Sequence, residues 1–170
     1  VDRSRGDRQK LINELKKIQS FIKDKKKINI EDLIKLTNLA ENYNVSELID
    51  SCLSKNKRKT INILSENNYS LEDCILIIRT FLIKSKKLLN LCKEFKTKRN
   101  VEDVISSARP PIFWKDKENV RLQINNWSHH DVENLIYKIN DIELLIKKNN
   151  NNSINILSNF IIEQTVTASN

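Results

Sequence analysis

Apolar residues recur along most of this chain at steps of three and four, the spacing that places them on one face of a helix. The longest apolar stripe predicts a helix over about residues 71–97, and another predicts a helix from Ser128 to about residue 148. The first stripe consists of Leu71, Cys74, Ile75, Ile78, Phe81, Leu82, Leu88, Leu89, Cys92 and Phe95. The second consists of Val132, Leu135, Ile136, Ile139, Ile142 and Ile146. No stretch alternates at period two, so the predicted fold is all-α.

Capping residues mark where the helices begin. Ser70 and Ser128 each have an aspartate three positions on, which is close to the capping-box pattern. The other residues predicted to cap helices are Asn29, Ser46, Asn56 and Asn100. Stripes and caps together predict helices at about residues 7–23, 30–41, 46–53, 56–67, 101–107, 116–126 and 153–164. The asparagine tract at 149–152 is expected to be a loop.

The shorter helices also have a predicted buried face. In the helix that Asn56 opens, Ile61 and Leu64 are expected to point inward. The apolar positions of the last helix are Ile154, Leu157, Phe160 and Ile161. A domain boundary is expected near residues 54–56, because the first three helices then form a small bundle and the remainder a larger one. The predicted domains are therefore residues 1–54 and 55–170.

One irregular stretch interrupts the helical pattern. Arg109-Pro110-Pro111 must be an extended break, because proline lacks a backbone donor and disfavours helix in the residue before it. Three apolar side chains follow at once, and Trp127 lies a short helix further on. We expect Pro110, Pro111, Phe113, Trp114 and Trp127 to anchor this linker on the helical body, with all three aromatic rings largely buried.

The net charge of +8 is unevenly distributed. Residues 1–30 hold ten Lys and Arg against four Asp and Glu, which leaves +6 in this part. A second basic cluster is formed by Lys84, Lys86, Lys87, Lys93, Lys96, Lys98 and Arg99, among which Glu94 is the only acid. Such clusters either neutralise nucleic-acid phosphates or are solvated helix faces. Lys84, Lys86 and Lys87 are the candidate DNA-facing residues, although no aromatic residue interleaves with them to stack on bases.

No residue pattern predicts catalysis, a metal or a cofactor. Gly6 is the only glycine, so there is no glycine-rich loop for phosphates. His129 and His130 lie at a predicted helix start and lack the further ligands that a metal site needs. The three cysteines, expected to be reduced and buried or half-buried as in a cytoplasmic protein, are Cys52, Cys74 and Cys92. No apolar run is long enough to span a membrane. The chain begins at Val1 without methionine, so we expect an N-terminal part to precede it.

Several segments, taken in order, resemble the delta-subunit family of the bacterial DNA polymerase III clamp loader, in its alphaproteobacterial branch. The segments in the first part are residues 1–11, 28–33, 46–51 and 57–64, which resemble the arginine-rich entry to a lid domain, two helix starts and the opening of a collar domain. Ile77-Ile78-Arg79 resembles a "leucine-x-arginine" helix. Residues 109–115 and 123–128 resemble "proline-proline-x-phenylalanine … glutamine-x-x-x-tryptophan", and Glu143 with Lys147 resembles "glutamate-x-x-x-lysine". Departures from the pattern are Leu48, Thr60 and Asn62.

The resemblance implies a lid-type three-helix bundle of the AAA+ kind, followed by a collar-type bundle that assembles the loader ring. It implies a non-catalytic subunit of the polymerase III holoenzyme that helps load the sliding clamp onto primed DNA. The partners would be the delta-prime and gamma/tau subunits through the collar, the clamp through a domain upstream of Val1, and primer-template DNA indirectly. The implied subunit-interface candidates are Arg79, Glu143 and Lys147.

Two other functions remain open from the residues alone. One is a free-standing basic helical module that binds nucleic acid through residues 1–30 and 84–99. The other is a small helical enzyme, which the lack of any catalytic arrangement disfavours. A phosphate-driven binder would lose affinity steeply as salt rises, which distinguishes the first of these from a loader subunit.

Overall fold

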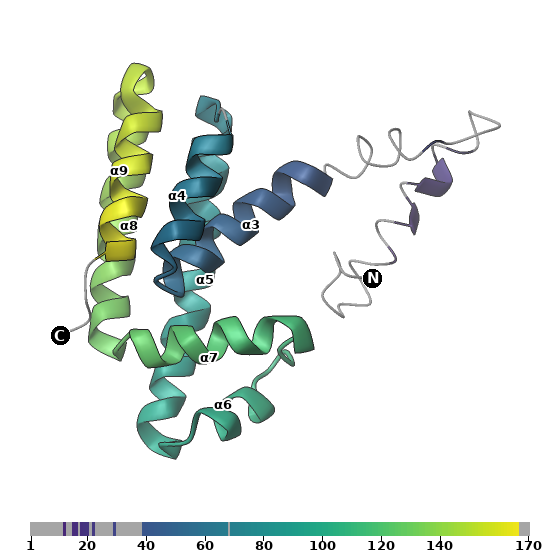
Figure 1. Ribbon diagram of the computed structural model, residues 1–170, viewed down its shortest axis with the longest axis vertical. Helices are drawn as coiled ribbons and strands as arrows, with labels where there is room; N and C mark the ends of the chain where they lie inside the picture. The colour runs from purple at the N-terminus through teal and green to yellow at the C-terminus, as the bar shows by residue number, and fades with distance from the viewer. Residues whose placement is uncertain are drawn as a thin grey trace. The chain divides into compact units, whose positions relative to one another are not determined.

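The computed structural model describes residues 12, 15, 16, 18–20, 22, 29, 39–67 and 69–166 (Figure 1). Every regular element over these residues is a helix, and the predicted all-α class is confirmed. The chain divides into two compact units, Val1–Asn44 and Val45–Asn170, each described here by itself.

In the first unit, residues 12, 15, 16, 18–20 and 22 are helical, within the helix predicted at 7–23. Most of that helix, and most of the helix predicted at 30–41, lies outside the described residues. The next element, α3 (Leu39–Leu53), runs on into the second unit. The prediction that Ser46 caps a separate helix is wrong, because Ser46 lies inside α3. No proline or glycine interrupts this stretch, so the helix continues through it.

The second unit is a helical bundle. Besides the end of α3 it consists of α4 (Lys57–Glu66), α5 (Leu71–Lys98), α6 (Val101–Ser107), α7 (Lys117–Asn126), α8 (His129–Lys148) and α9 (Ser153–Val166). Short 3-10 turns at Trp114–Asp116 and Asn150–Asn152 precede α7 and α9. In Figure 1, α4, α5, α8 and α9 run along the long direction of the bundle, whereas α7 crosses it near one end. The bundle is built mainly on the packing of α5 against α8.

Capping side chains fix the starts of α4, α5, α6 and α8 as predicted. Ser70 and Ser128 both form complete capping boxes, in which the serine accepts from a backbone N–H and the aspartate three positions on accepts from the serine N–H. Asn56 and Asn100 accept backbone hydrogen bonds at the starts of α4 and α6. The asparagine tract expected to be a loop is a single 3-10 turn between α8 and α9.

One core joins all the long helices of the bundle. Its buried members come from α3 and α5 through α9, and include most of the predicted stripes. The fully buried large side chains are Phe81, Leu48, Ile49, Leu53, Ile77, Ile78, Leu88, Leu135, Ile139, Ile146, Leu157 and Ile161. The end of α3 thus belongs to this core, and the compact unit begins at Val45. The boundary expected near residues 54–56 falls at the turn between α3 and α4. The assignment of lid and collar domains stays a prediction.

Three predicted inward positions are wrong. Ile61 of α4 is 39% exposed, Ile154 of α9 is 46% exposed and Leu71 of α5 is 37% exposed. In α4 the fully buried residue is Thr60, whose hydroxyl lies 2.9 Å from the hydroxyl of buried Ser51 and donates to the carbonyl of Asn56. Because its hydroxyl is satisfied by these partners, a polar residue fills a core position.

Candidate interaction surfaces

Trp127 lies where the turn after α3, the junction of α7 and α8, and the end of α9 meet. It is 6% exposed, and its Nε1 donates to the carbonyl of Leu53, 2.8 Å away at the end of α3. Lys55, in the left-handed conformation with φ of 57°, places its amine 3.7 Å from the centre of the Trp127 ring. The same amine donates to the carbonyl of Gln164, 2.6 Å away near the end of α9. The prediction that the Trp127 ring is largely buried is confirmed, and a cation is stacked on its face.

The proline break is less buried than predicted. Pro110 and Pro111 are exposed, Phe113 is half-buried, and Trp114 is 68% exposed, so the expectation that all three aromatic rings are buried is wrong for Trp114. Trp114 opens the 3-10 turn before α7, and its described ring contacts are Phe113, with ring centres 5.8 Å apart, and the Lys115 amine, 5.4 Å from its ring centre. The linker is held instead by Ile112, which packs against the core.

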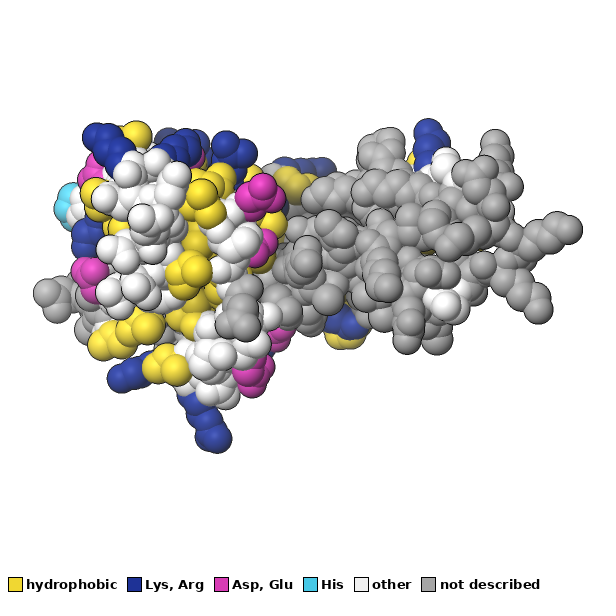
Figure 2. Space-filling model, turned by 90° about the horizontal axis from the view of Figure 1, so that it is seen from above, with side chains coloured by type: hydrophobic (Ala, Val, Ile, Leu, Met, Phe, Trp, Pro, Cys, Tyr) yellow, Lys and Arg dark blue, Asp and Glu magenta, His cyan; other side chains and the backbone are white. Residues whose placement is uncertain are grey.

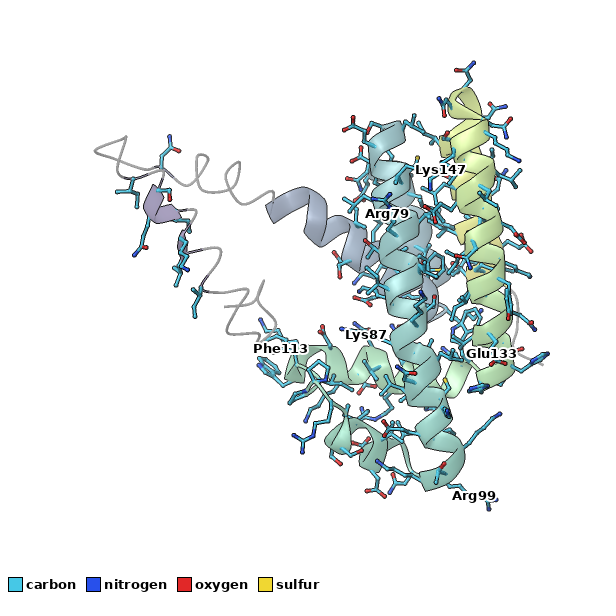
Figure 3. The ribbon with its side chains drawn as sticks, turned by 180° about the vertical axis from the view of Figure 1, so that it is seen from behind. Arg79, Lys87, Arg99, Phe113, Glu133 and Lys147 are labelled. Carbon is cyan, nitrogen blue, oxygen red and sulfur yellow. The ribbon has the colours of Figure 1, made fainter. Side chains whose placement is uncertain are left out.

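The three candidate DNA-facing lysines differ in their surroundings. Lys86 and Lys87 are exposed on α5, where Figure 3 labels Lys87. Lys84 is half-buried, with its amine 2.5 Å from Asp50 Oδ1 and 3.0 Å from the Ser46 carbonyl oxygen. This amine joins α5 to α3, so Lys84 reaches a phosphate only by giving up those contacts.

We expect Asp50→Ala to lower the free energy of unfolding by about 1–3 kcal/mol, because it leaves the half-buried Lys84 amine without its carboxylate. The matched control is Lys86→Ala, an exposed site whose loss costs less than about 0.5 kcal/mol. Guanidinium unfolding followed by circular dichroism measures both. Equal effects would mean that the Lys84–Asp50 pair adds nothing to stability.

The interface candidates taken from the resemblance lie on two helices. Arg79 is exposed on α5, and Glu143 and Lys147 lie on α8. Figure 3 labels Arg79 and Lys147. The Lys147 amine is 2.7 Å from Glu143 Oε1, so these two residues form an ion pair within α8. Any partner that uses them meets a pair whose charges already offset each other.

Sequence reasoning missed the apolar side chains that point outward. On α8, Tyr137 is 70% exposed and Leu144 is 57% exposed, and they lie seven residues apart on one helix face. Their spacing outside the buried stripe was the available signal. Seen from above, hydrophobic side chains form a band across the described part, with Lys and Arg at its margins (Figure 2). Leu145 and Ile154, beside the α8–α9 connection, are 45% and 46% exposed.

The three cysteines are buried, and His129 lies near a carboxylate of its own helix. Cys52, Cys74 and Cys92 are free thiols and all are buried, as predicted. Burial raises the pKa of Cys52 and of Cys92 to about 11, so both thiols are protonated at neutral pH. His129 Nδ1 lies 3.6 Å from Glu133, four residues on in α8. Over the part of the chain that the structure describes, no group of three or more His, Cys, Asp and Glu side chains is placed to hold a metal ion.

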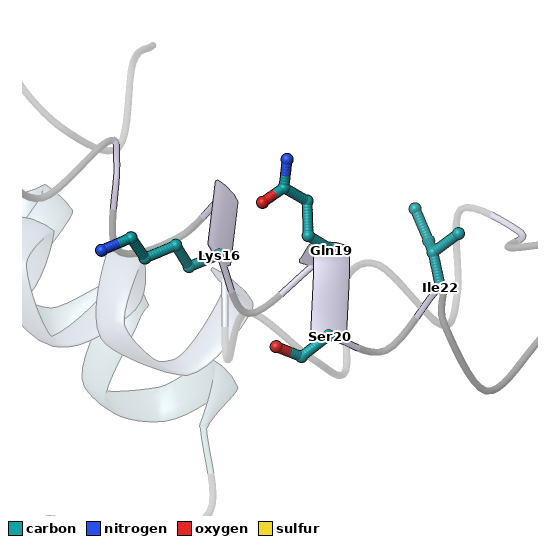
Figure 4. Close-up of a pocket in the computed structure, with 4 residues that line it drawn as sticks. All are labelled: Lys16, Gln19, Ser20 and Ile22. Atoms are coloured by element: carbon teal, nitrogen blue, oxygen red, sulfur yellow. The ribbon is translucent and has the colours of Figure 1, made fainter.

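A hollow in the first unit is lined by Lys16, Gln19, Ser20 and Ile22 (Figure 4). Among the described residues, the side chains of this lining offer one amine, one amide and one hydroxyl. Within the described ranges, none of the helices combines the length and the hydropathy of a membrane-spanning segment.

No family model, no curated protein and no solved structure matches this chain.

Proposed function

We propose that this chain is the lid and collar part of a delta subunit of the bacterial DNA polymerase III clamp loader. In this role it is a non-catalytic cytoplasmic component that helps load the sliding clamp onto primed DNA. Its bundle joins the delta-prime and gamma/tau-type subunits in a ring. The chain itself carries out no nucleotide chemistry and holds no cofactor.

The proposal rests on the position in the bundle of the motif at residues 109–115 and 123–128. Residues 109–115 form the break between α6 and α7, and Gln123 and Trp127, the two named positions of the second half of the motif, are each 6% exposed. They lie four residues apart, one turn of helix, at the junction of α7 and α8. Gln123 and Trp127 are thus buried where the chain passes from α7 to α8, whereas Pro110, Pro111 and Trp114 in the first half of the motif are exposed.

The outer face of α8 supports an assembly role. Tyr137 and Leu144 leave much of their apolar surface in water, and the core of a subunit interface is more apolar than the rest of the surface and enriched in aromatic side chains. The ion pair of Glu143 and Lys147 lies on the same helix and would form part of the polar rim. We therefore assign the ring contact to this face, with Arg79 of α5 as a further candidate.

The test is co-purification of this chain with delta-prime and gamma/tau-type subunits from the same organism. Tyr137→Glu with Leu144→Glu is expected to reduce the recovered complex at least tenfold, because it places carboxylates in an apolar contact. The matched control on α8 is Lys138→Glu, also exposed, which should leave recovery unchanged. A complex insensitive to the double substitution would remove α8 from the interface.

Nucleic-acid binding is the second candidate function, and exposed Trp114 favours it. Its ring lies beside the Lys115 amine, and Arg109 and Lys117 are exposed nearby in the chain. An aromatic ring among cations is the usual platform on which a single-stranded base stacks. This surface suits the single-stranded part of primer-template DNA whether or not the chain belongs to a loader.

Binding of single-stranded DNA is measured by the fluorescence anisotropy of a labelled 20-nucleotide strand at increasing salt concentrations. Trp114→Ala is expected to weaken binding by about 1–3 kcal/mol, the usual value of one stacked base. Trp114→Phe, which keeps a ring, should retain most of the affinity. If the alanine variant binds as tightly as the wild type, base stacking at Trp114 is refuted.

A further inference from the structure

The outer face of α5 carries two rows of side chains with a seven-residue repeat. Leu76 and Ile83 form the first row and are 40% and 60% exposed. Arg79, Lys86 and Lys93 form the second row, in which Arg79 and Lys86 each lie three residues after a position of the first and Lys93 follows seven residues further on. Since residues three and seven apart share a helix face, the two rows lie side by side, and the row of cations extends for about 21 Å at 1.5 Å per residue. Arg79 and Lys87 are labelled along this helix in Figure 3.

The charge of this face is of one sign. From Cys74 to Lys93 the chain has five cations and no Asp or Glu. One of the five, Lys84, is held by Asp50 on the inner side. Arg79, Lys86, Lys87 and Lys93 are exposed, and none of the four makes an ion pair with a described residue. The bundle therefore leaves this row of cations uncompensated beside two exposed aliphatic side chains.

The charge of two segments argues against either of them covering this face. Residues 1–30 hold ten Lys and Arg against four acids, and residues 167–170 hold no acid, so neither of these two segments offers complementary charge, whereas residues 31–44 hold three acids and one Lys. Two copies meeting through this face would bring like charges together, which costs several kcal/mol. Phosphates would match the cations but would leave Leu76 and Ile83 in contact with a charged backbone.

We propose that the outer face of α5 binds an acidic amphipathic helix of another protein. The partner helix places leucine-like side chains against Leu76 and Ile83 and Asp or Glu against Arg79, Lys86 and Lys93. This is the pairing by which heptad positions and flanking charges select a helix partner. The inference goes beyond the proposed function, because it rests on α5 alone and does not require a clamp loader.

The probe is a synthetic labelled 21-residue peptide of three heptads, with leucine at positions a and d and glutamate at e and g. Fluorescence anisotropy measures its binding to the full chain at 150 mM salt. We expect saturable binding that weakens at least tenfold for Ile83→Ser and for Arg79→Glu with Lys86→Glu. Leu122→Ser, at an exposed apolar site on α7, is the matched control and should bind as the wild type does.

Two control peptides test whether binding depends on the acidic charge and on the leucine spacing of the probe. A peptide with lysine in place of glutamate, and one with the same composition but shuffled leucines, should each bind at least tenfold more weakly. Circular dichroism confirms that each variant keeps its helices. The proposal is overturned if the shuffled peptide binds equally well, or if duplex DNA binds this face with dependence on the cations and none on Ile83. It is also overturned if sedimentation shows self-association that Ile83→Ser abolishes.

Discussion

Replacing Trp127 by alanine is expected to lower the free energy of unfolding of the bundle by about 3–5 kcal/mol. The ring is 6% exposed, so its removal opens a cavity at the meeting point of the α3–α4 turn, the α7–α8 junction and α9. The substitution also leaves the Leu53 carbonyl without the Nε1 donor and the Lys55 amine without the ring that it covers. Both losses add to the cavity cost.

The matched control is Trp114→Ala, because Trp114 is 68% exposed and its removal opens no cavity. Its expected cost is below about 0.5 kcal/mol. Guanidinium unfolding followed by circular dichroism at 222 nm gives both values on one scale. Equal losses for the two tryptophans would contradict the placement of Trp127 at the centre of these connections.

Phe81→Ala is the second large effect, with an expected loss of about 3–5 kcal/mol. Phe81 is fully buried in α5, and its ring centre lies 5.8 Å from that of Phe160 in α9. The substitution therefore removes an aromatic pair at the contact between the two helices. The same unfolding measurement should give a clearly smaller loss for Phe113→Ala, because Phe113 is half-buried at the proline break. A larger loss at Phe113 would make the break, and not α5, the centre of the core.

The helices were predictable because their signals are local. Ser70 and Ser128 form capping boxes with aspartates three positions on, and a window of four residues contains the whole motif. The same local reading failed at Ser46, where a good capping residue lies inside α3. The helix pattern on both sides of Ser46 outweighed its capping preference.

Burial depended on packing that no short window contains. Trp114 and Trp127 are the same residue type near the same break, yet only Trp127 meets a backbone carbonyl from another part of the chain, at Leu53. Thr60 is buried and Ile61 is not. The Thr60 hydroxyl can be buried because it lies against the hydroxyl of Ser51 in α3. A pattern of apolar residues does not indicate which polar residues are buried, so it could not predict the pair of Thr60 and Ser51.

The candidate surfaces were only partly predictable for the same reason. Charge counting found the basic residues of α5, but it did not separate Lys84, which pairs with Asp50 in α3, from exposed Lys86 and Lys87. Tyr137 and Leu144 were not predicted, because the buried stripe of α8 does not indicate which residues on the other face of the helix are exposed. An apolar heptad on a face opposite a buried stripe is the signal that finds such surfaces.

The clamp-loader role is tested most directly by the mass of the assembly that this chain forms with delta-prime and gamma/tau-type subunits of the same organism. Native mass spectrometry of the purified mixture is expected to show one complex that contains a single copy of this chain. The role is contradicted if the chain, shown by circular dichroism to be folded, stays free at micromolar concentrations of all subunits. Tight, salt-sensitive binding of DNA by that free chain would favour the nucleic-acid module instead.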